Sequence, residues 1–156
     1  MIQRIQSVYF LVALLLCAFP LFGLELFQFH WDEQQISMNA YALKDLGNPD
    51  FSSHNDSWIL CLILIVLLIV TLLSYKNRKR QITLAWFAFI LNLLTTSWMV
   101  LGVFVEKSAC TSCKSTGIDE LGIGFFAFAS AFLFIFLGLR GVQKDQKLIS
   151  SLDRLR

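Results

Sequence analysis

The sequence predicts an all-α integral membrane protein: a bundle of four transmembrane helices, with a small extracytoplasmic β cap expected between helices one and two. Two observations predict this class. Four apolar segments lie at about residues 8–24, 58–74, 82–105 and 121–139. Each reaches or approaches the roughly 20 residues that a helix needs to cross a hydrocarbon core about 30 Å thick. Basic and acidic residues also sort to opposite ends of these segments.

The overall composition supports a single membrane domain spanning residues 1–156. Hydrophobic residues make up 56% of the chain, which exceeds the usual share in soluble proteins. The net charge is only +2, so its distribution carries more information than its size. A basic excess confined to one membrane face is explained by insertion and anionic headgroups, so we expect no nucleic acid as primary ligand.

The side that holds both termini is basic. Of the 13 Lys and Arg residues, those on this side are Arg4, Lys76, Arg78, Lys79, Arg80, Arg140, Lys144, Lys147, Arg154 and Arg156. Its only acids are Asp145 and Asp153, whereas the other side carries nine acids against Lys44, Lys107 and Lys114. Because Lys and Arg stay cytoplasmic, we expect a multi-pass protein of the bacterial inner membrane with both termini inside.

The first segment and the loop after it predict a retained helix and a cap. Pro20 lies near the outer end of the helix, where it costs little, and no small-x-small cleavage site follows. In the loop 25–57, apolar residues alternate loosely from Leu26 to Tyr41, which is typical of a strand or hairpin. Its second half is rich in turn residues.

Helices two and three are predicted to be antiparallel neighbours, because the turn at 76–81 is short. Asn92 falls near the middle of helix three, where an amide needs a partner. An interhelical hydrogen bond is the plainer interpretation and a place in a substrate path the sharper one.

Helix four carries small residues that predict a packing stripe. They are Gly124, Ala127, Ala131 and Gly138, at spacings that keep them on one face. The tail 140–156 continues a helical pattern of apolar and charged residues, so it extends helix four or lies on the membrane surface.

Cys110 and Cys113 form the only motif with intrinsic reactivity. In an oxidising envelope a plain disulfide between them is expected, and redox function is the alternative. Cys17 and Cys61 are placed near opposite membrane faces, too far apart for a relay. His30 and His54 fit no recognised zinc spacing, so no metal or cofactor is predicted.

The basic turn and the tail are the predicted partner- or lipid-binding elements. The residues concerned are Lys76, Asn77, Arg78, Lys79, Arg80, Lys144, Asp145, Lys147, Asp153, Arg154 and Arg156. Topology and lipid headgroups explain most of this charge. A surface that docks a protein or RNA is the further hypothesis.

Four stretches of the chain resemble a known family. These are the opening 1–9, the segment 38–43, the turn 76–81 and the ending 144–156. They are similar to an uncharacterised bacterial family of four-helix integral membrane proteins, known only as a domain of unknown function. The resemblance implies no activity or ligand, and the pair Cys110/Cys113 is not part of its pattern.

The sequence therefore favours a non-enzymatic accessory or scaffold subunit of the inner membrane. It would dock another membrane or cytoplasmic protein through the basic turn and tail, with the lipid bilayer as its other partner. The alternative is a membrane thiol-disulfide oxidoreductase that uses Cys110 and Cys113 with a quinone. A small transporter subunit with Asn92 in its path is a third hypothesis.

Overall fold

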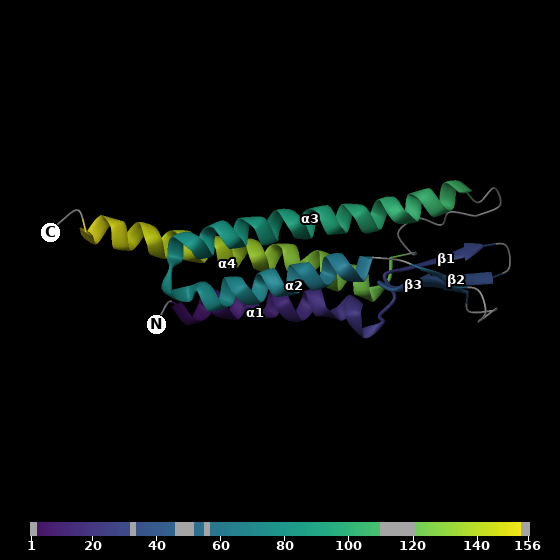
Figure 1. Ribbon diagram of the computed structural model, residues 1–156, viewed down its shortest axis with the longest axis horizontal. Helices are drawn as coiled ribbons and strands as arrows, with labels where there is room; N and C mark the ends of the chain where they lie inside the picture. The colour runs from purple at the N-terminus through teal and green to yellow at the C-terminus, as the bar shows by residue number, and fades with distance from the viewer. Residues whose placement is uncertain (1–2, 32–33, 46–51, 55–56, 110–120, 154–156) are drawn as a thin grey trace.

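In the computed structural model, four long helices run alongside one another and a small sheet stands at one end of them (Figure 1). The structure describes residues 3–31, 34–45, 52–54, 57–109 and 121–153. The helices are α1 (Gln3–Ala18), α2 (Ser57–Leu73), α3 (Arg78–Ala109) and α4 (Ile123–Asp153). Four helices of the described chain are long and apolar enough to cross a membrane, so this is a multi-pass membrane protein.

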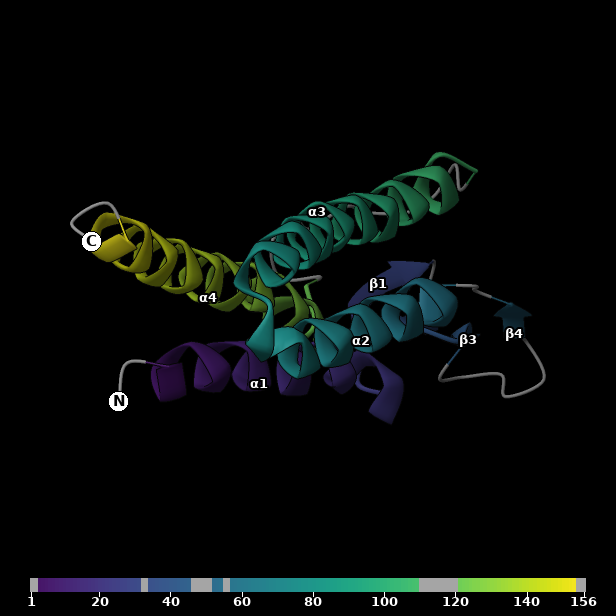
Figure 2. The ribbon, with the colours of Figure 1, turned by 60° about the vertical axis from the view of Figure 1, so that its left-hand side comes forward.

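The sheet is an antiparallel meander between α1 and α2. Its strands, in spatial order, are β1 (Phe27–Trp31), β2 (Gln34–Met38), β3 (Ala42–Asp45) and β4 (Ser52–His54). Figure 2 shows β4 at the edge beyond β3. The predicted β cap is confirmed. Its β3 and β4 strands were not predicted, because they lie in or beside a segment dominated by turn residues.

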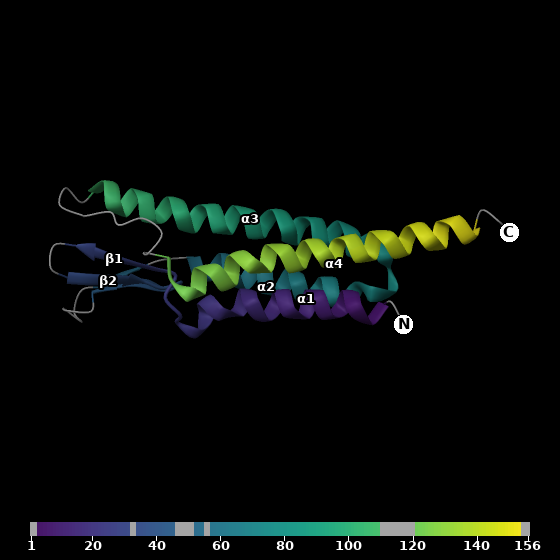
Figure 3. The same ribbon diagram turned by 180° about the vertical axis from the view of Figure 1, so that it is seen from behind.

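The two ends of the bundle differ. Both chain termini lie at the end away from the sheet (Figure 1). We call this the terminal end; it also holds η2 (Ser74–Lys76), a 3₁₀ turn that joins α2 to α3. We call the opposite end the sheet end. At the terminal end, α4 runs on past the other helices, as the view from behind also shows (Figure 3).

The chain leaves α1 through a short 3₁₀ helix, η1 (Phe19–Phe22), that begins where proline fixes the backbone. Pro20 is buried, and Gly23 ends the turn with a φ of 78°. The Gly23 N–H donates to the Pro20 carbonyl at 3.3 Å. Left-handed backbone of this kind favours glycine, which explains Gly23 at the exit.

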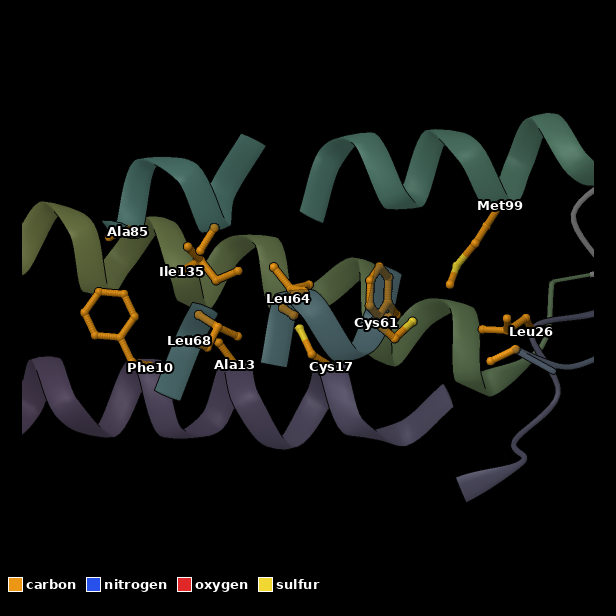
Figure 4. Packing of buried hydrophobic residues seen from close by; sticks show 14 of the residues in the cluster. Phe10, Ala13, Cys17, Leu26, Cys61, Leu64, Leu68, Ala85, Met99 and Ile135 are labelled. Atoms are coloured by element: carbon orange, nitrogen blue, oxygen red, sulfur yellow. The ribbon is translucent and has the colours of Figure 1, made fainter. Parts of the chain in front are cut away.

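The helices enclose one apolar core, part of which is shown in Figure 4. In that view Phe10, Ala13 and Cys17 extend from α1 toward the other helices. α4 packs against α1 on one side and against α3 on the other, where the Phe89 and Phe132 rings stack with centroids 4.6 Å apart. Phe132 and Phe136 of α4 thus pack beside Phe89 in the groove between α3 and α4.

The sheet end is tied to the start of α4 through backbone. The Gly122 N–H donates to the Leu26 carbonyl at 2.9 Å, and the Gly124 N–H donates to the Glu25 carbonyl at 3.1 Å. A Cβ on Gly122 or Gly124 would collide with the Glu25 carbonyl oxygen, so both positions require glycine for this close approach.

α3 and α4 are longer than their apolar segments, whereas α1 and α2 are not. α1 begins at Gln3 rather than near residue 8 and ends at Ala18, and α4 continues to Asp153, so the tail from residue 140 extends the helix, which is the first of the two predicted alternatives. α3 likewise exceeds its expected span of 82–105 at both ends. Hydrophobicity marks where a helix is in contact with lipid, whereas Gln, Lys and Arg are good helix formers and prolong it in water.

Candidate functional site

The last part of α4 stands clear of the bundle. Contacts between α4 and α1 run from Gly138 against the Phe10 ring, through Gly141 against Gln6, to a hydrogen bond at Asp145. We call residues 146–153 the α4 tail. At 1.5 Å per residue it rises about 12 Å beyond Asp145. Figures 1 and 3 show it protruding.

The core-facing stripe of α4 continues into this tail without a cover. Val142 and Asp145 are 1% and 6% exposed. Ile149, one helical turn further along the same stripe, is 43% exposed, and its neighbour Leu148 is 50% exposed. No other described element accompanies α4 here, so two apolar side chains are left open over the terminal end.

The opposite stripe of α4 changes from apolar to basic. Leu133 and Leu137 are exposed apolar residues on the outer side of the bundle. At the same helical spacing they are followed by Arg140, Lys144 and Lys147, all exposed. The Arg140 guanidinium carbon lies 5.2 Å from the centroid of the Phe136 ring. This change marks the level where hydrocarbon gives way to headgroups and water.

The basic turn lies at the same end. Lys76, Lys79 and Arg80 are exposed and Arg78 is half-buried. Asn77 has a local role: its side-chain oxygen accepts a hydrogen bond from the Arg80 backbone N–H at 3.4 Å, which caps the start of α3. The basic residues of the turn therefore lie at the surface, whereas the Asn77 side chain is bonded to the backbone of Arg80.

Asp145, predicted as a binding residue, is inside the bundle. Its Oδ2 accepts a hydrogen bond of 2.6 Å from the Gln6 amide nitrogen, and Gln6 is itself only 7% exposed. Burial removes Asp145 from the predicted docking surface and makes it a link between α1 and α4. The side chains of Asp153, Arg154 and Arg156 lie outside the described residues.

Asn92 occupies the centre of the core and is fully buried. Its amide nitrogen lies 3.9 Å from the Cys17 sulfur, across the bundle from α3 to α1. Its Oδ1 has no hydrogen-bond partner among the described residues. Thr95 and Thr96 bond back to carbonyls of their own helix, so they do not extend a polar path from Asn92.

The placement of Cys17 and Cys61 on opposite membrane faces is wrong. α1 runs toward the sheet and has Cys17 near its end, while α2 runs away from the sheet and has Cys61 near its start. Both thiols therefore lie in the sheet-end half of the core (Figure 4). Both are free and 0% exposed, so no substrate thiol reaches them.

The small residues of α4 do not all pack against one helix. Gly138 and Ala131 are buried, Gly138 against Phe10. Gly124 meets the loop after η1 rather than a helix, and Ala127 is half-buried. Gly122, Gly141 and Gln6 were missed. The spacing of Gly138 and Gly141 beside Asp145 was the available signal for a close contact with another helix.

Cys110 and Cys113 lie outside the described residues, so the predicted disulfide stays a prediction. Within the part of the chain that the structure describes, no three His, Cys, Asp or Glu side chains are grouped closely enough to hold a metal ion. No reactive centre is assembled by the described side chains. The terminal end is the feature that the geometry singles out.

Comparison with known families agrees with the resemblance seen in the sequence. The family described as "Domain of unknown function (DUF4293)" matches residues 2–155. The chain therefore belongs to this family, whose function is unknown. No curated protein matches the chain.

Proposed function

We propose that this protein is a non-enzymatic accessory or scaffold subunit of the bacterial inner membrane, which docks a partner protein through its terminal end. Both termini would be cytoplasmic. The observation that carries the proposal is the α4 tail, which leaves the bundle with Leu148 and Ile149 open and basic side chains beside them. A helix that served only to cross the membrane would not need this extension.

The charge distribution supports the orientation. Seven basic residues with described side chains lie at the terminal end: Lys76, Arg78, Lys79, Arg80, Arg140, Lys144 and Lys147. The acid there whose side chain is described, Asp145, is buried. Such a face is favoured on the cytoplasmic side during insertion and attracts acidic groups afterwards.

The test is crosslinking in native membranes followed by affinity purification and mass spectrometry. Full-length protein is compared with a chain ending after Lys147 and with Lys76→Glu/Lys79→Glu. A cut after Gly141 is unsuitable, because it also removes the buried residues Val142 and Asp145. Protein levels in the membrane are matched before purification.

We expect both variants to insert and to lose the same co-purifying protein. Ser151→Ala on the exposed face of the tail and Cys110→Ser/Cys113→Ser are the controls, and both should retain it. An unchanged set of partners in the shortened chain would overturn the docking role. Quinone-dependent thiol oxidation abolished by Cys110→Ser/Cys113→Ser would instead establish the oxidoreductase alternative.

A further inference from the structure

The α4 tail provides two exposed apolar side chains, Leu148 and Ile149, where the helix leaves the bundle. Ile149 continues the stripe of Gly138, Val142 and Asp145, which faces the other helices. Leu148 follows Gly141, the residue that packs against Gln6. Residues three, four and seven apart share a helix face, so Ile149 faces the space beyond the contact with α1. Leu148 follows Lys144 by four residues as well as Gly141 by seven, so it lies at the edge between this face and the basic stripe.

The opposite side of α4, which carries Leu133 and Leu137, is the side that faces lipid. The exposed stripe of Leu133 and Leu137 becomes Arg140, Lys144 and Lys147 as α4 leaves the hydrocarbon. Anionic headgroups around the bundle are therefore adjacent to the basic stripe, whereas Ile149 points away from them and Leu148 lies between the two.

The tail is about as long as a helix is wide. The tail rises about 12 Å above Asp145, and an α-helix with its side chains is about 10–12 Å across. One helix resting on the bundle end would contact Leu148 and Ile149 at its flank. Its other flank would approach the exposed Lys76, Lys79 and Arg80 of the turn.

The charges select the occupant. A second copy of this chain would bring the same basic turn and basic stripe together, and like charges oppose that pairing. We propose that the occupant is an acidic amphipathic helix of a partner protein, with an apolar stripe on Leu148 and Ile149 and carboxylates toward the basic turn. This inference rests on the proposed docking function and specifies the class of partner that docks.

The experiment uses full-length protein in nanodiscs of phosphatidylcholine alone. The probe is a fluorescein-labelled synthetic helix of about three heptads, with a Leu/Ile stripe and Glu at the flanking positions. A scrambled peptide of the same composition and a peptide with Lys in place of Glu are the comparators. Binding is followed by fluorescence anisotropy at two salt concentrations.

We expect saturable binding of the acidic helix, about tenfold or more tighter than either comparator and weakened by salt. Leu148→Ser/Ile149→Ser should weaken it by about tenfold. Lys76→Glu/Lys79→Glu should do so as well, whereas Ser151→Ala should bind as the parent does. Equal binding of the scrambled peptide, or no effect of Leu148→Ser/Ile149→Ser, overturns the proposal.

The other occupants are tested by Ile149→Cys in the Cys110→Ser/Cys113→Ser background. Quenching of a bimane at this position by brominated lipids would assign the face to the bilayer. Disulfide crosslinking between two copies would assign it to self-association. Either result overturns the proposal. If the shortened chain loses partners but the acidic helix does not bind, only the partner class fails; if partners are unaffected, the proposed function fails.

Discussion

At the scale of single residues, Asn92 is the most unusual position. A polar amide at the centre of an apolar core normally has its hydrogen-bonding groups satisfied by a neighbouring helix. Here the amide nitrogen has only a distant thiol, and Oδ1 has no partner among the described residues. Burial of the unpaired Oδ1 of Asn92 therefore lowers the free energy of unfolding.

We expect Asn92→Leu to raise the free energy of unfolding by about 1–2 kcal/mol, because it removes an unsatisfied group at similar volume. Reversible unfolding in mixed micelles measures the change. Thr95→Val is the matched control on the same helix and should shift stability by less than about 0.5 kcal/mol. A loss of stability in Asn92→Leu would show that the amide has a partner in the membrane.

Gly138 is tightly packed against another helix, whereas Gly102, also within a helix, is not. A Cβ on Gly138 would lie 2.9 Å from the ring of the fully buried Phe10. Gly138→Val should therefore destabilise the protein by about 1–3 kcal/mol through overpacking. Gly102→Ala meets only Met38 at 3.8 Å and should be stabilising by up to about 1 kcal/mol through helix propensity. Equal effects of the two changes in the same unfolding assay would contradict this account of the α1–α4 contact.

At the scale of elements, α1 and α4 form the closest helix pair, and its terminal end is secured by the Gln6–Asp145 hydrogen bond. Glycines at 138 and 141 let the two backbones approach, and the hydrogen bond then lies at the level where the tail departs. The direction of the tail thus depends on a contact far from it in sequence.

Two substitutions of Asp145 distinguish its role as a hydrogen-bond acceptor from the effect of its negative charge. Asp145→Asn keeps a side-chain oxygen for the Gln6 amide and should change stability by less than about 1 kcal/mol. Asp145→Ala leaves Gln6 buried without its acceptor and should cost about 1–3 kcal/mol. The measurement is unfolding in mixed micelles. If Asp145→Asn lost as much as Asp145→Ala, the carboxylate charge itself would be required.

Sequence reasoning reached the elements but not the contacts between them. The four helices and the β cap follow from apolar runs, alternation and charge, each of which is local. The pairing of Gln6 with Asp145 spans 139 positions, and no periodicity within one helix indicates it. The same limit applies to Cys17, whose closeness to Asn92 depends on how α1 and α3 face each other. Helix direction alone, however, would have placed Cys17 and Cys61 at the same end.

At the scale of the whole molecule, the polar parts divide into a basic end and an acidic one. The sheet end carries Glu25, Asp45 of β3 and Glu106 of α3, whereas the terminal end carries the basic turn and the basic residues of the last part of α4. The two ends therefore meet different compartments if the helices span the bilayer, and orientation decides which surface a cytoplasmic partner sees.

Cysteine labelling tests the orientation. In the Cys110→Ser/Cys113→Ser background, whose remaining thiols Cys17 and Cys61 are buried, Gln28→Cys and Lys79→Cys each provide one exposed thiol. We expect an impermeant maleimide to label Gln28→Cys in intact spheroplasts and Lys79→Cys only after the membrane is opened. Labelling of Lys79→Cys in intact spheroplasts would reverse the assignment.

The pairing of Glu25 and Leu26 with Gly122 and Gly124 joins the first quarter of the chain to its last. The ribosome synthesises these partners far apart in time, so the carbonyls of Glu25 and Leu26 have no α4 partner until residues 122–124 have been made. Until α4 enters the bilayer, Phe10 also lacks the helix that covers it. A nascent chain halted after α3 is thus an open, half-paired intermediate, and the arrival of α4 is the event that completes assembly at both membrane surfaces together.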